Sequence, residues 1–96
     1  MPPRRGHADH NHARIAHELR QVGAVVLDVH GSAGCMDLLV GFRGVWRLLE
    51  VKNMGGRGMR FTEAERETMR LAEAAGCIVH VVTSGDEALK AIGAIK

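Results

Sequence analysis

The sequence is poor in aromatic residues, proline and cysteine. Its 96 residues include one Trp, two Phe and no Tyr, and Pro and Cys occur twice each. So few aromatic side chains argue against nucleic-acid binding that is driven mainly by base stacking. Cys35 and Cys77 lack a CxxC spacing, so they form no disulfide framework. We expect both to be small, buried residues with free thiols, and a disulfide or a shared metal is the alternative.

Long hydrophobic runs are also missing. No apolar run approaches the roughly 20 residues needed to span a bilayer, so we expect no membrane association. The basic residues at the start lead into polar ones, which is unlike a signal peptide. We therefore expect a cytoplasmic protein, in a bacterium or a phage-infected host cell. The length allows one domain, which we place at residues 11–96 after a disordered tail at 1–10.

Net charge is low, but its distribution is uneven. The formal net charge is +2. Residues 1–60 contain nine Lys or Arg against five Asp or Glu, whereas residues 61–96 contain four against six. A basic half permits phosphate contact on one side of the molecule, although solvated surface charge explains the same counts.

Hydrophobic periodicity and turn signals predict an α/β fold. Asn11 is a candidate cap for a first helix that stops at Gly23. Thr62 with Glu65, and Ser84 with Glu87, are capping boxes that predict two more helices. We expect strands at residues 24–29, 37–42, 45–51 and 77–83, with the last one buried on both faces. The order is α-β-β-β-α-β-α, a mixed four-stranded sheet flanked by helices.

The second and third strands place three ionisable residues together. If Arg43 and Gly44 form a two-residue hairpin turn, Asp37 pairs with Glu50, and Lys52 shares their face of the sheet. Two opposed carboxylates repel unless a cation neutralises them, and Mg²⁺ prefers such oxygen ligands. A three-residue loop would shift this register, and scattered surface charges are the alternative interpretation.

This arrangement resembles the PD-(D/E)XK nuclease superfamily. In detail it is similar to small phage-type VRR-NUC domains, which are related to Holliday-junction resolvases. The matching stretches are GCMDLLVG at residues 34–41 and LLEVKN at residues 48–53. Met36 stands where a proline often precedes the aspartate. The resemblance covers residues 11–93 and implies a restriction-endonuclease-like core.

The resemblance also implies an activity and a catalytic set. Asp37 and Glu50 would bind Mg²⁺ or Mn²⁺, with the backbone carbonyl of Val51 as a further ligand. Lys52 would position or help to deprotonate the attacking water and stabilise charge on the phosphate. The expected function is endonucleolytic hydrolysis of DNA, selective for branched or junction structures, by a homodimer.

Four further residues are candidates. Related enzymes often carry an acidic residue early in the first helix, where this chain has Arg14, and Glu18 follows one turn later. Glu65 stands where the family commonly has glutamine. Arg57 and Arg60, in or beside a glycine-rich loop after Lys52, suit phosphate contact. The alternative for Glu18, Arg57 and Arg60 is that they are solvent-exposed charges without a role in the site. For Glu65, the capping box alone is enough to account for a glutamate at this position.

Two rival functions stay open. One is a catalytically inactive DNA-binding module of the same fold, which divalent-ion binding would distinguish from a nuclease. The other is an α/β regulatory subunit that does not bind nucleic acid, in which Glu50 and Lys52 form an ordinary ion pair. Such a subunit would have no DNA affinity at any salt concentration.

Overall fold

The computed structural model describes residues 6–29, 37–53 and 61–96. Three helices and four strands follow the expected order, and no described helix is both long and apolar enough to cross a membrane. The elements are α1 (Gly6–Gln21), β1 (Val25–Asp28), β2 (Leu38–Phe42), β3 (Val45–Val51), α2 (Glu63–Ala74), β4 (Val79–Val82) and α3 (Gly85–Ala91).

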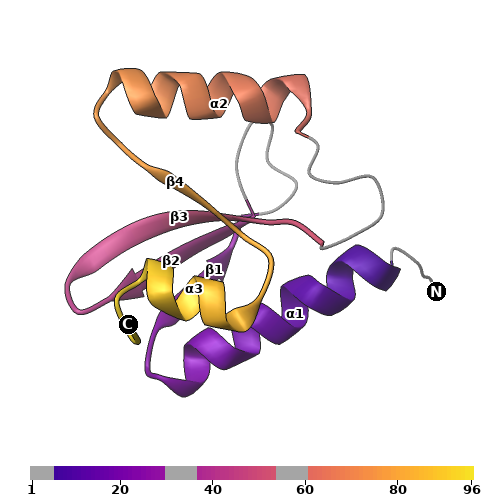
Figure 1. Cartoon of the computed structure of the whole chain (residues 1–96), viewed down its shortest axis with the longest axis vertical. Helices are drawn as coiled ribbons and strands as arrows, with labels where there is room; N and C mark the ends of the chain where they lie inside the picture. The colour runs from indigo at the N-terminus through magenta and orange to yellow at the C-terminus, as the bar shows by residue number, and fades with distance from the viewer. Residues whose placement is uncertain (1–5, 30–36, 54–60) are drawn as a thin grey trace.

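The four strands form one mixed sheet in the order β1-β2-β3-β4. The first three strands are antiparallel neighbours, and β4 runs parallel to β3. Figure 1 shows α1 and α3 together on one side of the sheet and α2 on the other. The expected α/β architecture, with a mixed sheet flanked by helices, is confirmed.

The hairpin between β2 and β3 has the expected two-residue turn. Arg43 and Gly44 both have positive φ, 51° and 81°, as a type I′ turn requires. The register runs from Phe42 opposite Val45 to Leu38 opposite Leu49. The turn therefore fixes which face of the sheet each following residue occupies, including Glu50.

The hydrophobic core lies between the sheet and the α1–α3 layer. Alternate strand residues such as Val40, Leu49 and Val82 are buried there, against Ile15 and Leu19 of α1. Because side chains alternate along a strand, the intervening residues of β3 point to the opposite face, toward α2. The core thus supports one face of the sheet and leaves Glu50 on the other.

The start of the first helix differs from the expectation. Helix α1 begins at Gly6, so Asn11 is not its cap, and residues 6–10 are helical rather than a disordered tail. The Asn11 side chain instead donates hydrogen bonds to the carbonyls of Lys52, at 3.2 Å, and Thr83, at 3.4 Å. A long-range contact of this kind leaves no local pattern in the sequence.

The fourth strand and the second cysteine also differ. Strand β4 spans only Val79–Val82 at the edge of the sheet, and Val82 is its one fully buried residue. Cys77 and Ile78 precede the strand and are exposed. The expectations of a strand buried on both faces and of a buried Cys77 were therefore wrong, because α2 buries none of its own residues and covers β4 incompletely. Cys35 lies outside the described residues.

The hairpin geometry makes a prediction about Gly44. Its φ of 81° strains any side chain except asparagine or aspartate, which tolerate this region. Gly44→Ala should lower the free energy of unfolding by about 1 kcal/mol in urea titrations, and Gly44→Asn should lower it by clearly less. Equal losses for both variants would contradict a type I′ turn at this position.

Candidate active site

Asp37 is held at the end of the hairpin by three backbone contacts. Its N–H donates to the carbonyl of Leu49 at 3.1 Å, and its carbonyl accepts from Val29 at 3.0 Å. Its carboxylate Oδ2 accepts the N–H of Val51 at 2.8 Å. The regular ladder ends at Leu38 opposite Leu49, so the expected Asp37–Glu50 rung does not form. The Asp37 side chain contacts the residue after Glu50 instead.

Glu50 is the one buried polar residue among those that the structure describes, with 2% of its surface exposed. Its Oε2 lies 3.0 Å from the ammonium of Lys52. Its Oε1 is buried and has no hydrogen-bond partner. The pKa of Glu50 is raised to about 7, chiefly because burial disfavours the charged form. The contact with Lys52 opposes this rise, and the nearby Asp37 and Glu65 add to it. The site therefore carries a carboxylate whose negative charge is poorly compensated.

Lys52 is the cation of the site and bridges two carboxylates. Its Nζ lies 3.0 Å from Glu50 Oε2 and 3.3 Å from Glu65 Oε1. Burial alone would lower its pKa, but the contacts with Glu50 and Glu65 outweigh it and raise the pKa of Lys52 above the ordinary 10.5. The ammonium consequently stays charged at neutral pH, which suits an electrostatic role better than that of a proton acceptor.

Glu65 and Phe61 bring the start of α2 into the same cluster. The capping box is present, with Thr62 N–H donating to Glu65 Oε1 at 3.0 Å, and the same oxygen approaches Lys52. These contacts lower the pKa of Glu65, although burial opposes the shift. The ring centroid of Phe61 lies 4.8 Å from Lys52 Nζ, a cation–π distance. One glutamate thus both caps the helix and holds the lysine.

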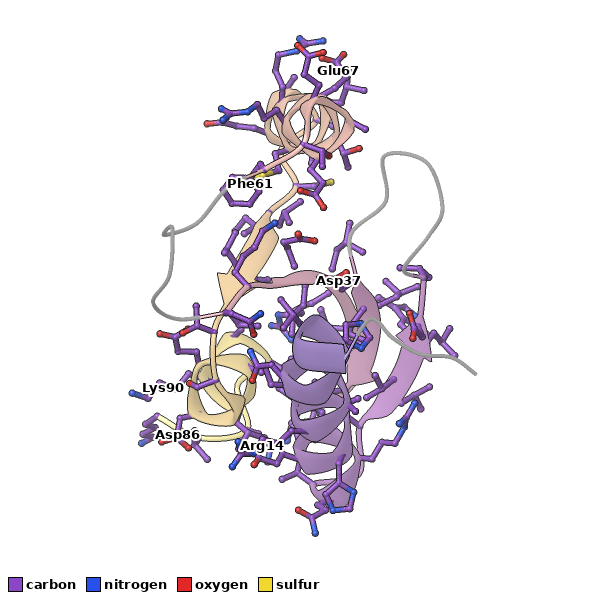
Figure 2. All side chains as sticks on the ribbon, turned by 90° about the vertical axis from the view of Figure 1, so that its right-hand side faces the viewer. Arg14, Asp37, Phe61, Glu67, Asp86 and Lys90 are labelled. Carbon is purple, nitrogen blue, oxygen red and sulfur yellow. The ribbon has the colours of Figure 1, made fainter. Side chains whose placement is uncertain are left out.

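Phe61 and the role of Asn11 were not predicted from the sequence. Phe61 directly precedes the capping box, so its position beside a helix start was readable, but its contact with Lys52 depends on how the chain returns from β3. Figure 2 shows the labelled Phe61 just below α2, with Asp37 between α2 and the α1–α3 layer. Asn11 ties α1 to the ends of β3 and β4, beside Lys52.

Glu18 is not brought to this cluster. Glu18 packs against the buried Gly85 at the start of α3, where any Cβ would collide with its carboxylate. This contact lies on the α1–α3 side of the sheet, whereas Glu50 faces α2. Arg57 and Arg60 lie outside the described residues. Within residues 6–29, 37–53 and 61–96, no three His, Cys, Asp or Glu side chains gather closely enough to hold a metal ion by themselves.

Comparison with known proteins identifies the fold. No family model and no curated protein matches the sequence. A solved structure described as a "VRR_NUC domain" aligns with a TM-score of 0.67 and 25% sequence identity, over 88% of this chain and 92% of the other. VRR-NUC domains belong to the PD-(D/E)XK nuclease superfamily. The resemblance and the fold class expected from the sequence are thereby confirmed.

Because the pKa of Glu50 is raised, we predict that the stability of the folded protein depends on pH. An ordinary glutamate has a pKa of 4.5, and folded Glu50 has one of about 7. Between these values folded Glu50 binds a proton that the unfolded chain does not, so the contribution of Glu50 to the free energy of unfolding falls as pH rises from 4.5 to 7. This fall should amount to about 2–3 kcal/mol in a metal chelator, and it should disappear in Glu50→Gln.

The matched control is Glu67→Gln, because Glu67 is an exposed residue of α2 whose carboxylate pairs with Arg70. Urea titrations at several pH values should give this variant the same pH dependence as the wild type. A Glu50→Gln variant that keeps the wild-type dependence would show that Glu50 has an ordinary pKa.

Proposed function

We propose that this chain, which has the fold of a VRR_NUC domain, is a divalent-metal-dependent endonuclease that hydrolyses DNA phosphodiester bonds. One observation carries the proposal. The carboxylate of Glu50 is buried, its Oε1 lacks a partner, and Asp37 adds further negative charge beside it. A buried carboxylate whose charge is only partly compensated lowers stability, so its presence favours a functional role.

The residues present fit a divalent cation with oxygen ligands. Asp37 and Glu50, through its unpartnered Oε1, are the side chains that would hold it, and the carbonyl of Val51 is a candidate third ligand. Mg²⁺ commonly binds proteins through one or two carboxylates and keeps several waters, so a larger cluster of acidic residues is not required. Bound Mg²⁺ or Mn²⁺ would supply an activated water and polarise the phosphate.

Lys52 would stabilise the charge that develops during hydrolysis. Its ammonium is already positioned by Glu50 and Glu65 and stays protonated at neutral pH. A positive charge fixed before the reaction needs no reorganisation when negative charge builds up on the phosphoryl oxygens. Glu65 and Phe61 would act as positioning residues, since both contact the ammonium from the start of α2.

Substrate contact is assigned to the segment that follows Lys52. We propose that Arg57 and Arg60 bind DNA phosphates, as bidentate guanidinium groups do in many nucleic-acid complexes. We also propose selectivity for branched or junction DNA, a cytoplasmic location and a homodimeric state. The resemblance to resolvase-like enzymes supports the first of these. A panel of single-stranded, duplex, flap and four-way-junction DNA tests substrate preference directly.

Replacing Lys52 separates a nuclease from an inactive DNA-binding module. Lys52→Met keeps most of the side-chain bulk and removes the charge. Cleavage in Mg²⁺ or Mn²⁺ should fall by a factor on the order of 10²–10³, while metal binding and DNA affinity persist. Lys90→Met, at an exposed position of α3, should leave cleavage unchanged. Near-normal turnover in a folded Lys52→Met variant would overturn the proposed role of the lysine.

A further inference from the structure

Two backbone carbonyls mark the point where the paired strands β3 and β4 end. The last backbone hydrogen bond between the two segments runs from the N–H of Lys52 to the carbonyl of Val82, at 2.9 Å. Beyond it the segments separate, because Thr83 leads into the cap of α3 at Ser84. Within the described part of the chain, the carbonyls of Lys52 and Thr83 therefore have no partner in a strand.

One side chain, that of Asn11, serves both of these carbonyls. Its amide nitrogen Nδ2 lies 3.2 Å from the carbonyl oxygen of Lys52 and 3.4 Å from that of Thr83. A carbonyl only accepts hydrogen bonds, and an amide NH₂ group carries two hydrogens, so one asparagine can donate to two such acceptors. Asn11 precedes Lys52 by 41 residues and Thr83 by 72, so it joins segments that meet only in the folded protein.

The helix that carries Asn11 is firmly packed. Ile15 lies one turn further along the same side of α1 and is completely buried in the core, and Leu19 is buried one turn after that. An asparagine side chain has only two torsions, so its amide moves little when the helix is fixed. Asn11 thus connects the end of the sheet to the packed part of α1.

The backbone of Lys52 is held on both sides of its Cα. The N–H of Lys52 is bonded to Val82, and its carbonyl is bonded to Asn11. Rotation about the N–Cα bond of Lys52 would move its Cβ and its carbonyl carbon together, because both are attached to Cα. Holding the carbonyl therefore also holds the direction in which the lysine side chain leaves the backbone.

The base of the Lys52 side chain needs such a contact because the chain leaves the sheet there. The ammonium lies at the end of a flexible four-carbon stem. Glu50 and Glu65 hold the far end of this stem, at 3.0 Å and 3.3 Å from Nζ. The next residue, Asn53, is exposed. Asn11 is thus the contact that fixes the near end of the stem at the last position of the sheet edge.

We propose that Asn11 is a positioning residue for Lys52, because its amide fixes the backbone from which the ammonium extends. The positioning is a property of the folded chain, and its effect on cleavage rests on the proposed nuclease function. A charge that is fixed before the reaction stabilises the transition state without reorganisation. Loss of Asn11 should therefore slow the chemical step and leave the binding of metal and DNA in place.

Asn11→Ala removes both hydrogen bonds in a protein that we expect to fold. Alanine has the highest helix propensity, so α1 itself is not weakened. A pocket of about 320 Å³ opens beside Asn11 and is also lined by Thr83 and Ser84. Water from this pocket can hydrogen-bond to the two carbonyls in the variant. A water molecule is not attached to α1, however, so the carbonyls are satisfied but no longer held.

The first measurement follows the ammonium of Lys52 by NMR, without metal or DNA. The chain has three lysines, and Lys90 and Lys96 are exposed. A proton–nitrogen correlation spectrum of the ammonium groups is therefore simple, and Lys52→Met identifies the signal of Lys52. In the wild type these protons should exchange slowly with water, because two carboxylates bind the group. In Asn11→Ala and in Asn11→Asp, which keeps the shape without the donors, exchange should be faster by about tenfold or more, since local opening becomes more frequent.

Arg20→Met is the matched control. Arg20 lies in the last turn of α1 and also donates to a strand carbonyl, that of Val26 at 2.9 Å. Its loss removes a contact of the same kind at the other end of α1, so exchange of the Lys52 ammonium should match the wild type. Wild-type exchange in Asn11→Ala or in Asn11→Asp overturns the proposal. So does an equal acceleration in Arg20→Met, which would reveal a general loosening of α1.

The second measurement is the kinetics of cleavage. In Asn11→Ala, kcat should fall by about 10–100-fold with KM nearly unchanged. In a Lys52→Met background, Asn11→Ala should lower kcat no further, because the group that it positions is already gone. A full additional loss in that background would overturn the proposal. A wild type that cuts no DNA, but whose ammonium exchange responds to Asn11→Ala as expected, counts against the nuclease function and supports the positioning role.

Discussion

Burial of the Glu50 carboxylate is the constraint on which the site depends. Moving a carboxylate out of water costs several kcal/mol unless a partner compensates for it. Lys52 provides part of this compensation through Glu50 Oε2, and Oε1 is left without a partner. The ammonium of Lys52 also contacts Glu65 and Phe61 at the start of α2. These contacts attach the start of α2 to the end of β3. One buried charge thus organises two elements.

The geometry of the hairpin explains why this charge lies where it does. Positive φ at Arg43 and Gly44 sets a two-residue turn, and the turn sets the alternation of β3. Leu49 enters the core, so Glu50 must face α2, and Lys52 follows on the same face. The Asp37 carboxylate then accepts a hydrogen bond from the N–H of Val51, in place of a further backbone hydrogen bond between β2 and β3. A shift of one residue would bury Lys52 in the core and expose Leu49.

Local signals in the sequence predicted much of this arrangement. Arg43-Gly44, between two runs of residues that favour strands, specified the turn and the register of the hairpin. The Thr62–Glu65 spacing specified the helix cap. What the sequence did not reveal were contacts between distant segments. The hydrogen bond from Asn11 to Lys52 at the end of β3 and the contact of Phe61 with Lys52 both join segments that meet only in the folded chain. The exposure of Cys77 and Ile78 depends on how far α2 covers the sheet, which no local pattern records.

The central claim is that Asp37 and Glu50 hold a divalent ion that allows the chain to cut DNA. The most direct measurement compares cleavage of junction, flap, duplex and single-stranded DNA by the wild type and by Asp37→Asn, with Mg²⁺ or Mn²⁺ and with a chelator. Asp86→Asn, at an exposed residue of α3, is the control. We predict metal-dependent cleavage by the wild type and by the control, and no cleavage by Asp37→Asn. The ion should also raise the stability of Asp37→Asn by less than it raises that of the wild type. Undiminished cleavage by a folded Asp37→Asn protein, or no cleavage of any substrate by the wild type, would contradict it.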